Sequence, residues 1–374
     1  MYVRILLLLN LSFYLSASSL KEVYKDKFRI GSAINIQEQL IQHPEKFEAL
    51  IKKEFNSLVA ENAMKWEALN PQKGVYNFKL ADALVNFAYK NNMQVVGHVL
   101  FWHNQTPDWL FKDDQGHVVS KDELLKRMRF HITTLHQRYG NKIQSWDVVN
   151  EAIDEDGSVK NTPWKKILGD DWILQAFQMA EEVFPSSTKL IYNDFNVFNK
   201  KKLTGIVSMV DQLLAAGIRI DAIGVQAHWA LDYPSDKSIE NLINQISSRG
   251  LKIDISELDI DVLPMLKSFS GGAEITENHS YKQSMDPYRK EFPKAKQEEL
   301  AARYANIFRI FLKHSDKIDR VNFWGLNDQF SWKNEWPISD RKNHPLLFDR
   351  NHQAKAAYYR VLQSPSIELK GSTQ

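Results

Sequence analysis

The chain has 374 residues, of which 43% are hydrophobic and 25% are charged, so it can form a sizeable core and differs from a disordered protein. Its 48 Lys and Arg residues against 46 Asp and Glu residues leave a net charge of +2, which excludes a strongly basic nucleic-acid-binding protein. The absence of cysteine excludes disulfides, thiolate metal sites and a cysteine nucleophile.

The first 18 residues have the pattern of a secretory signal peptide. Arg4 precedes an apolar run, Ile5–Leu15, and the small residues Ser16–Ser18 suit a cleavage site. The alternative is a membrane anchor, but the run falls short of the roughly 20 residues that a bilayer span needs. We therefore expect residues 1–18 to be removed and residues 19–374 to form one secreted or periplasmic domain, without membrane attachment after cleavage.

Eight short apolar runs alternate along the chain with longer segments of helical period, such as Leu203–Ala216. This alternation is typical of parallel strands joined by crossover helices. The runs are Phe28–Asn35, Ser57–Asn62, Gln94–Trp102, Ser145–Glu151, Lys189–Asp194, Ala222–His228, Lys252–Asp259 and Arg320–Asp328. The pattern predicts an α/β fold, a single (β/α)8 TIM barrel, with a doubly wound open sheet as the alternative.

Polar or aromatic side chains near the carboxyl ends of the runs favour the barrel. They are Glu61, Asn62, His98, Trp102, Asn150, Glu151, Asn193, Asp194, Gln226, His228, Glu257, Asp259, Trp324 and Asp328. In a barrel these ends converge on one face, whereas an open sheet would leave most of them far from a single crevice. Two long connections, Asn104–Gln144 after strand 3 and Pro264–Asp319 after strand 7, are expected to shape the site at that face.

Two glutamates in these runs form the strongest catalytic candidate. Glu151 and Glu257 each end an apolar run, and either one alone would be an ordinary salt-bridge partner or helix-start residue. On strands 4 and 7 of a barrel, however, they would face each other across its mouth. That arrangement suits acid/base and nucleophilic chemistry at a sugar acetal, and nearby tryptophans would provide flat platforms for sugar rings.

The sequence predicts neither a cofactor nor a metal ion. It contains no GxGxxG or GxxxxGK[ST] motif for a nucleotide. His98, His103, His228, Asp194 and Asp259 lie near strand ends, but no HExxH or similar ligand pair is present. A metal-dependent barrel enzyme is therefore disfavoured.

Seven short segments, in this order, carry a resemblance that covers the whole barrel. They are Glu61–Trp66, Gly97–Gln105, Trp146–Ala152, Tyr192–Asp194, Gly224–His228, Ser256–Asp259 and Trp324–Leu326. Together they resemble family 10 of the glycoside hydrolases, the endo-β-1,4-xylanases. The resemblance implies that residues 19–374 are a catalytic domain that hydrolyses internal bonds of xylan with retention of configuration, through a covalent glycosyl-enzyme intermediate. Xylan and xylo-oligosaccharides are then the expected partners, and we expect a monomer.

The resemblance also implies roles for individual residues. Glu151 matches the acid/base of the family and Glu257 matches its nucleophile. Asn150 matches the group that binds the sugar 2-hydroxyl, and His228 and Asp259 match the pair that holds the nucleophile in place. The expected substrate-binding residues are Glu61, Asn62, Lys65, His98, Trp102, Gln105, Trp324, Trp332 and Gln226, the last of these beside the nucleophile.

The sequence departs from the family pattern at two places. Phe195 stands where many members have tyrosine, so a hydroxyl on the leaving-group side is missing. Met265–Phe292 is longer than in compact members and is expected either to extend the cleft or to be a solvated excursion. Two further alternatives are a related barrel glycosidase acting on a β-1,4-glucan or mannan, and a sugar-binding protein without activity. The presence of both glutamates with their supporting residues speaks against the latter.

Overall fold

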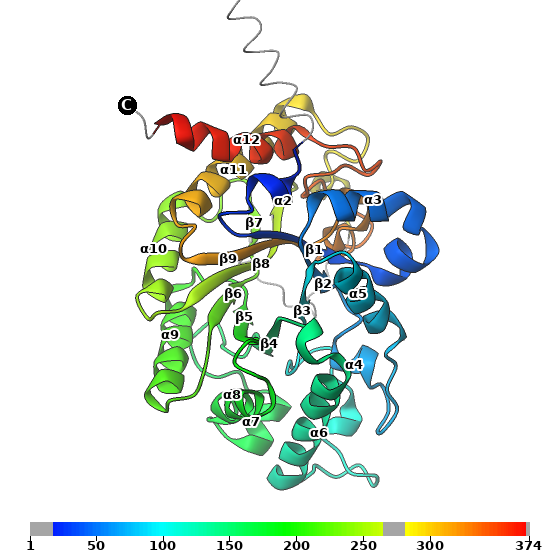
Figure 1. Ribbon diagram of the computed structural model, residues 1–374, viewed down its shortest axis with the longest axis vertical. Coiled ribbons are helices and arrows are strands. Elements are labelled where there is room, and N and C mark those ends of the chain that lie inside the picture. The colour runs from blue at the N-terminus through cyan, green and yellow to red at the C-terminus, as the bar shows by residue number, and fades with distance from the viewer. Residues whose placement is uncertain (1–17, 265–280, 372–374) are drawn as a thin grey trace, which may run out of the picture.

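The computed structural model describes residues 18–264 and 281–371 (Figure 1). Nearly all of the expected signal peptide, residues 1–17, and more than half of the expected cleft extension, residues 265–280, lie outside the described residues. The described chain begins beside its own C-terminal helix: the Tyr24 hydroxyl donates to the Val361 carbonyl at 2.7 Å.

The sheet is a closed ring of eight parallel strands, which confirms the predicted (β/α)8 barrel. Its strands are β1 (Arg29–Ile34), β2 (Ser57–Ala60), β3 (Gln94–Gly97), β4 (Ser145–Asn150), β5 (Lys189–Asp194), β6 (Ala222–Val225), β8 (Lys252–Asp261) and β9 (Ile318–Phe323). Pairing of β9 with β1 closes the ring, and β6 pairs directly with β8. A short additional strand, β7 (His228–Ala230), pairs with β8 next to β6.

Six of the eight predicted strands end earlier than expected, and three of them do so by three or more residues: the eighth run was expected to reach Asp328, but β9 ends at Phe323. The third run was expected to reach Trp102, but β3 stops at Gly97, and Phe101 rejoins β4 through an isolated bridge to Val149. The sixth run divides into β6 and β7 because Ala227 adopts a positive φ of 57° and turns the chain. Both breaks occur at the carboxyl ends of strands, where side chains are redirected toward the mouth of the barrel.

Helices surround the ring on its outer side (Figure 1). They are α2 (Leu20–Val23), α3 (Pro44–Glu54), α4 (Trp66–Leu69), α5 (Lys79–Lys90), α6 (Lys121–Tyr139), α7 (Pro163–Leu168), α8 (Trp172–Val183), α9 (Lys200–Ala215), α10 (Asp236–Ser247), α11 (Lys294–Lys313) and α12 (Ala356–Gly371). Helix α9 illustrates why these segments are helical. The Asn199 side chain caps its N-terminus by accepting a hydrogen bond from the Lys201 amide at 2.9 Å, and Ile206, Val210 and Leu213 face the core.

The interior of the barrel changes character along its axis. A small apolar layer of Ala33, Val59, Val96 and Trp324 lies below the mouth. Because side chains alternate along a strand, the positions two residues earlier also point inward, and these are Gly31, Ser57 and Gln94. At Gly31 a Cβ would lie 1.9 Å from Asn322 Oδ1, so the packed interior leaves no room for a side chain there. The apolar layer thus forms the floor of the mouth.

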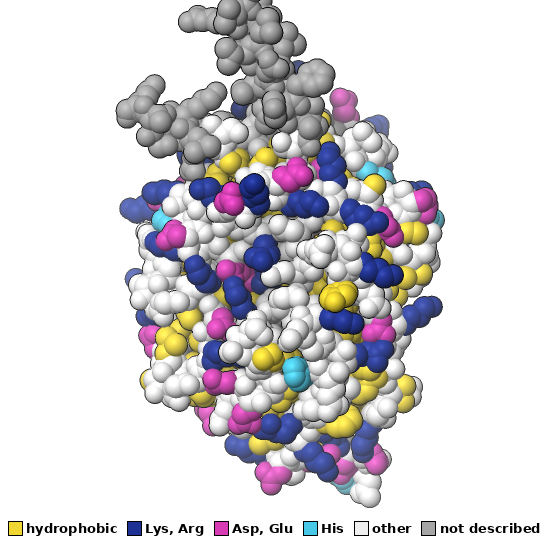
Figure 2. Space-filling view, viewed as in Figure 1, with side chains coloured by type: hydrophobic (Ala, Val, Ile, Leu, Met, Phe, Trp, Pro, Cys, Tyr) yellow, Lys and Arg dark blue, Asp and Glu magenta, His cyan; other side chains and the backbone are white. Residues whose placement is uncertain are grey.

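The surface has no dominant charge on the face that Figure 2 shows. Lys and Arg side chains are interspersed there with Asp and Glu side chains, in keeping with the net charge of +2. Among the described residues, no helix has both the length and the apolar character needed to cross a bilayer.

Candidate active site

A cavity of about 150 Å³ opens at the carboxyl ends of the strands. It brings together every residue predicted for the site except one. The lining residues are Glu61, Asn62, Lys65, His98, Trp102, Gln105, Asn150, Glu151, Gln226, His228, Glu257, Trp324 and Trp332. The exception, Asp259, lies directly behind His228, with its Oδ2 atom 3.0 Å from His228 Nδ1.

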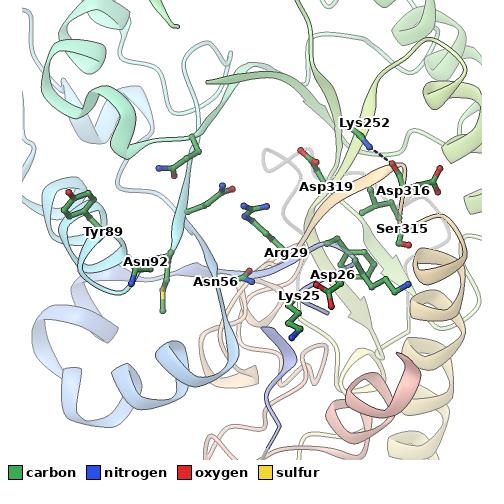
Figure 3. A pocket seen from close by; sticks show the side chains of 16 residues that line it. Lys25, Asp26, Arg29, Asn56, Tyr89, Asn92, Lys252, Ser315, Asp316 and Asp319 are labelled. Carbon is green, nitrogen blue, oxygen red and sulfur yellow. Dashed lines mark hydrogen bonds between the residues drawn. The ribbon is translucent and has the colours of Figure 1, made fainter. Parts of the chain in front are cut away.

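A larger hollow of about 980 Å³ lies at the opposite end of the barrel, where the strands begin (Figure 3). Arg29 points into its centre, and the ammonium group of Lys252 donates to the carbonyl of Asp316. Active sites of such barrels lie at the carboxyl ends of the strands, and Glu151, a buried carboxyl group whose pKa is raised to about 7, lines the smaller cavity. The smaller cavity is therefore the candidate active site.

The backbone at Glu151 is held in an unusual conformation. Glu151 follows β4 directly and has a φ of 57°, in the left-handed region that a glutamate rarely adopts. Its amide donates to the Asn193 carbonyl at 2.9 Å, and the amides of Ala152 and Ile153 donate to the Tyr192 hydroxyl at 3.1 and 3.0 Å. Strand β5 therefore fixes the direction in which the Glu151 side chain enters the cavity.

The Glu151 carboxyl group has mostly neutral hydrogen-bond partners. Trp102 Nε1 donates to Oε2 at 2.9 Å, and Gln226 Nε2 donates to Oε1 at 2.8 Å. Burial raises the pKa of Glu151 to about 7, assisted by the negative charges of Asp194 and Glu257, while the Gln226 hydrogen bond offsets part of the rise. Glu151 thus keeps its proton up to about neutral pH.

The Glu257 carboxyl group has one cationic partner, His228, and one neutral partner, Asn193. Its Oε2 atom is 3.2 Å from His228 Nε2, and its Oε1 atom accepts from Asn193 Nδ2 at 2.8 Å. Burial alone would raise the pKa of Glu257, but the His228 hydrogen bond and the charges of His98 and His228 outweigh it and hold this pKa below its ordinary value. Glu257 is therefore ionised at neutral pH.

His228 connects Glu257 to a second carboxylate. Burial disfavours its charged form, but the charge and hydrogen bond of Asp259, together with Glu257, raise the pKa of His228 to about 9. The ring is then protonated at neutral pH, so Nε2–H donates to Glu257 and Nδ1–H donates to Asp259. The structure thus brings together the three residues that were expected to form the nucleophile and its support.

Amide side chains link the two glutamates. Asn193 Nδ2, which donates to Glu257, also donates to Asn150 Oδ1 at 2.9 Å, and Asn150 Nδ2 donates to Glu151 Oε1 at 3.2 Å. Gln226, which was expected beside the nucleophile, lines the same cavity as Glu257, and its amide donates to Glu151. Sequence reasoning noted Asn193 as a polar residue at a strand end but did not assign it to the site.

One side of the cavity carries polar groups suited to sugar hydroxyls. Lys65 Nζ donates to Asn62 Oδ1 at 2.8 Å and to Gln105 Oε1 at 2.7 Å, and it lies 5.0 Å from the centroid of the Trp102 ring. Burial lowers the pKa of Lys65 and raises that of Glu61. These groups combine hydrogen-bonding capacity with an aromatic platform, as carbohydrate sites require.

Tryptophans close the adjoining side. Trp324 lies with its ring centroid 5.5 Å from that of His98, and His98 Nδ1 is 2.8 Å from Asp147 Oδ2. The Trp332 ring lies 4.7 Å from the His228 ring, and its Nε1 donates to Asp259 Oδ2 at 2.8 Å. Trp332 therefore both lines the cavity and positions the residues behind Glu257.

A buried ion pair behind Glu151 has no counterpart in the sequence analysis. Lys202 and Asp194 are both fully buried, with Nζ 2.9 Å from Oδ1, and the Phe195 ring centroid lies 3.6 Å from the same Nζ. Phe195, where many family members have tyrosine, thus packs against this cation. Lys202 ends a run of three lysines, which sequence alone suggests to be solvated.

Among residues 18–264 and 281–371, no three His, Asp or Glu side chains are placed to hold a metal ion. The charges of the site are instead compensated by protein groups: Glu257 by His228, and Asp194 by Lys202. The arrangement is thus a pair of carboxyl groups with opposite protonation states beside a sugar-sized cavity.

Comparisons with known proteins agree with this geometry. The profile of Glycosyl hydrolase family 10 matches residues 19–364. An endo-1,4-beta-xylanase A of Xylanibacter ruminicola is 40% identical over 92% of this chain and 93% of its own. An endo-1,4-beta-xylanase of Geobacillus stearothermophilus is 39% identical over 93% of this chain and 98% of its own. A solved GH10 endoxylanase from a sugarcane soil metagenome superposes with a TM-score of 0.87 at 43% identity, covering 93% of this chain and 99% of its own. The chain belongs to glycosyl hydrolase family 10.

Proposed function

We propose that the protein is a retaining endo-β-1,4-xylanase, with Glu257 as nucleophile and Glu151 as acid/base. The observation that carries this proposal is that Glu151 and Glu257 line one cavity with different surroundings, in which burial raises the pKa of the first and His228 lowers that of the second, because glycosidases with two carboxyl groups need one protonated and one ionised. Membership of glycosyl hydrolase family 10 supports retention. The names of the relatives, which are endo-1,4-beta-xylanases, support the substrate.

In the first step, an oxygen of Glu257 attacks the anomeric carbon while the bond from that carbon to the leaving sugar oxygen breaks. Glu151 gives its proton to the departing oxygen, and a covalent xylosyl-enzyme forms on Glu257. The Asn150 amide lies next to Glu151 and has a hydrogen-bond donor for the 2-hydroxyl of the sugar. Such a contact accelerates the reaction to the extent that it strengthens in the transition state.

In the second step, the ionised Glu151 removes a proton from water, and the resulting hydroxide oxygen attacks the anomeric carbon. The bond to Glu257 breaks, and Glu257 leaves as a carboxylate that His228 stabilises by its Nε2–H hydrogen bond. Two inversions at the same carbon give net retention, and both glutamates return to their starting protonation states.

Substrate binding is assigned to the polar cluster around Lys65 and to the tryptophans. Lys65, Asn62 and Gln105 already form a hydrogen-bonded group that presents donors and acceptors to the cavity. Trp102 and Trp324 provide ring faces or edges for the sugar. We propose that these residues bind the sugars of xylan and xylo-oligosaccharides that lie on the non-reducing side of the cut.

The direct test is reducing-sugar release from xylan, carboxymethylcellulose and mannan in parallel, with Glu257→Ala as the inactive control. We expect release from xylan and its loss in the variant. Release mainly from the glucan or the mannan would contradict the assigned sugar while leaving the chemistry in place. Release from none of the three by folded wild-type protein would contradict the activity itself.

We further propose that residues 1–18 are a signal peptide and that the mature chain is exported and acts as a monomer. Support for the signal peptide comes from the charged and apolar pattern of the N-terminus. N-terminal sequencing of protein from the culture medium and periplasm should begin near Ser19. Full-length protein in the membrane fraction, or a dimer by light scattering, would contradict these assignments.

A further inference from the structure

A second buried lysine lies behind the nucleophile. Lys333 is 2% exposed and belongs to the short helix η6 (Trp332–Asn334), which follows β9. Its ammonium group lies 3.6 Å from Asp259 Oδ1 and 3.8 Å from Asp261 Oδ2. A buried lysine placed between two carboxylates is costly to desolvate unless its charge compensates theirs.

The two oxygens of Asp259 are in different situations. Oδ2 accepts from His228 Nδ1 at 3.0 Å and from Trp332 Nε1 at 2.8 Å. Oδ1 is buried and has no hydrogen-bond partner among the residues that the structure describes, and the ammonium of Lys333 lies 3.6 Å from it. Asp261 differs, because its Oδ1 atom accepts from Asn343 Nδ2 at 2.8 Å and from the Leu263 amide at 2.9 Å.

These contacts form a chain of alternating charge that ends at the nucleophile: Lys333, Asp259, His228 and Glu257. We propose that Lys333 is a positioning residue for the glycosylation step, whose positive charge keeps Asp259 ionised and thereby keeps His228 protonated and donating to Glu257. The inference rests on the proposed role of Glu257. It extends the support of the nucleophile by one residue beyond the histidine and aspartate pair.

Other charged or titratable groups also lie close to this chain of alternating charge. Around Glu257 they are His98, Lys65, Glu151 and Asp147. Around Asp259 they are Tyr304 and, beyond the ammonium group, Asp261. Lys65 is engaged with Asn62 and Gln105 on the far side of the cavity. Removing the charge of Lys333 therefore leaves His228 as the remaining cationic partner of Asp259 in this chain of alternating charge.

The test uses the pH dependence of kcat/KM with an aryl β-xylobioside whose leaving group needs no proton. With this substrate the acid limb reports ionisation of Glu257 and is independent of the proton on Glu151. Lys333→Met removes the charge at similar volume and should move the acid limb upward by roughly 0.5 to 1 pH unit, the size expected for one charge several ångströms away in a protein of effective dielectric constant about 20. Lys333→Arg keeps the charge and should restore the wild-type limb.

A matched control separates charge from packing. Lys355 has a side chain that is 8% exposed and pairs with Asp328 at 2.9 Å, away from Glu257. Lys355→Met should lower the melting temperature but leave the acid limb where it is in the wild type. If Lys333→Met does not fold, Lys333→Gln takes its place in the same measurement.

The outcomes are distinct. An acid limb that does not move in a folded Lys333→Met or Lys333→Gln variant would overturn the inference, as would a shift that Lys333→Arg fails to reverse. An equal shift in Lys355→Met would mean that the effect is one of packing, which also overturns it. Activity of Glu257→Ala on the same substrate equal to that of the wild type would instead overturn the proposed function itself.

Discussion

The two glutamates of the cavity differ in what surrounds them far more than in how deeply they lie. Both are at least 95% buried, yet burial raises the pKa of Glu151 to about 7 while that of Glu257 falls below its ordinary value. Glu151 accepts hydrogen bonds from an indole and an amide, whereas Glu257 accepts one from a protonated imidazole. The comparison teaches that the hydrogen-bond partners, and not the depth, assign the acid and the nucleophile.

Behind each glutamate lies a buried lysine and aspartate. On the acid side Lys202 pairs with Asp194 at 2.9 Å, and on the nucleophile side Lys333 lies 3.6 Å from Asp259. The lysine and the aspartate are closer together on the acid side. There the Tyr192 hydroxyl donates to Asp194 and accepts from the amide that follows Glu151. The nucleophile-side pair acts through His228. The acid-side pair thus fixes the backbone next to Glu151, and the nucleophile-side pair fixes the positive charge of His228.

Removing the nucleophile should have the largest effect on activity. Glu257→Ala should lower kcat on xylan and on aryl xylosides alike by roughly 10⁴- to 10⁶-fold, because no covalent intermediate can form. The measurement is initial rates on both substrates. Glu299→Ala, at an exposed glutamate on α11 that pairs with Lys296, is the matched control and should keep wild-type rates. Azide added to Glu257→Ala should give the α-xylosyl azide, and a β-azide would contradict the assignment.

Removing the acid should have an effect that depends on the leaving group. Glu151→Ala should lower kcat/KM on xylan by about 10²- to 10⁴-fold, the usual contribution of general acid catalysis, but spare aryl xylosides whose leaving group needs no proton. Rates on a series of aryl xylosides measure this dependence. Losses of equal size across the series would mean that Glu151 does not protonate the leaving group.

Removing the imidazole should weaken the nucleophile side alone. His228→Ala takes away the Nε2–H donor and the positive charge next to Glu257, and should lower kcat/KM by roughly 10²-fold, comparable to the loss of one preorganised hydrogen-bond donor. The pKa of Glu257 should rise, so the acid limb of kcat/KM should move to higher pH. A pure loss of rate with an unmoved acid limb would indicate that His228 acts by packing only.

The wild-type pH profile should be bell-shaped. Glu151 must be protonated for the first step, so kcat/KM on xylan should fall as the pH rises through about 7. Glu257 must be ionised, so activity should be retained below its ordinary pKa and be lost only at lower pH. A profile that stays level on the alkaline side until the protein unfolds would contradict Glu151 as the acid.

The smallest expected effect concerns the lysine on the acid side. Lys202→Met removes a positive charge close to Glu151 and Asp194, so the pKa of Glu151 should rise and the alkaline limb should move upward by up to about one pH unit. The same change leaves Asp194 buried without its partner and should cost about 3 to 5 kcal/mol of unfolding free energy, measured in denaturant. A shift of the acid limb instead of the alkaline limb would remove the distinction between the two sides.

The barrel and the cavity lining could be predicted because each depends on a local pattern. Apolar runs of strand length gave the eight strands, and a polar side chain at a strand end must face the mouth when the strands close into a ring. Thirteen of the predicted residues accordingly line one cavity. The strand ends were less well predicted. The turn at Ala227, for example, depends on a positive φ, and the residue there is not a glycine, which would have indicated such a turn in the sequence.

The supporting charges could not be predicted in the same way. Lys202 closes a run of three lysines and Lys333 follows Trp332, and neither sequence context predicts a lysine that is buried beside a carboxylate, Asp194 for the first and Asp259 for the second. The hydrogen bond from Gln226 to Glu151 likewise depends on the relative height of two strand ends, which spacing along the chain does not determine. Sequence therefore located the reacting groups and, through the family resemblance, the support from His228 and Asp259, but not the buried lysines or the hydrogen bond from Gln226 to Glu151.

The central claim is that Glu257 attacks the sugar and Glu151 supplies the proton, and it is tested most directly by the configuration of the first product. Proton NMR of xylo-oligosaccharide hydrolysis, recorded within the first minutes, distinguishes the anomer released by the enzyme from the mixture formed later by mutarotation. The account predicts that the β-anomer appears first, because two inversions give retention. Initial appearance of the α-anomer would show a single inversion and would contradict the covalent role of Glu257.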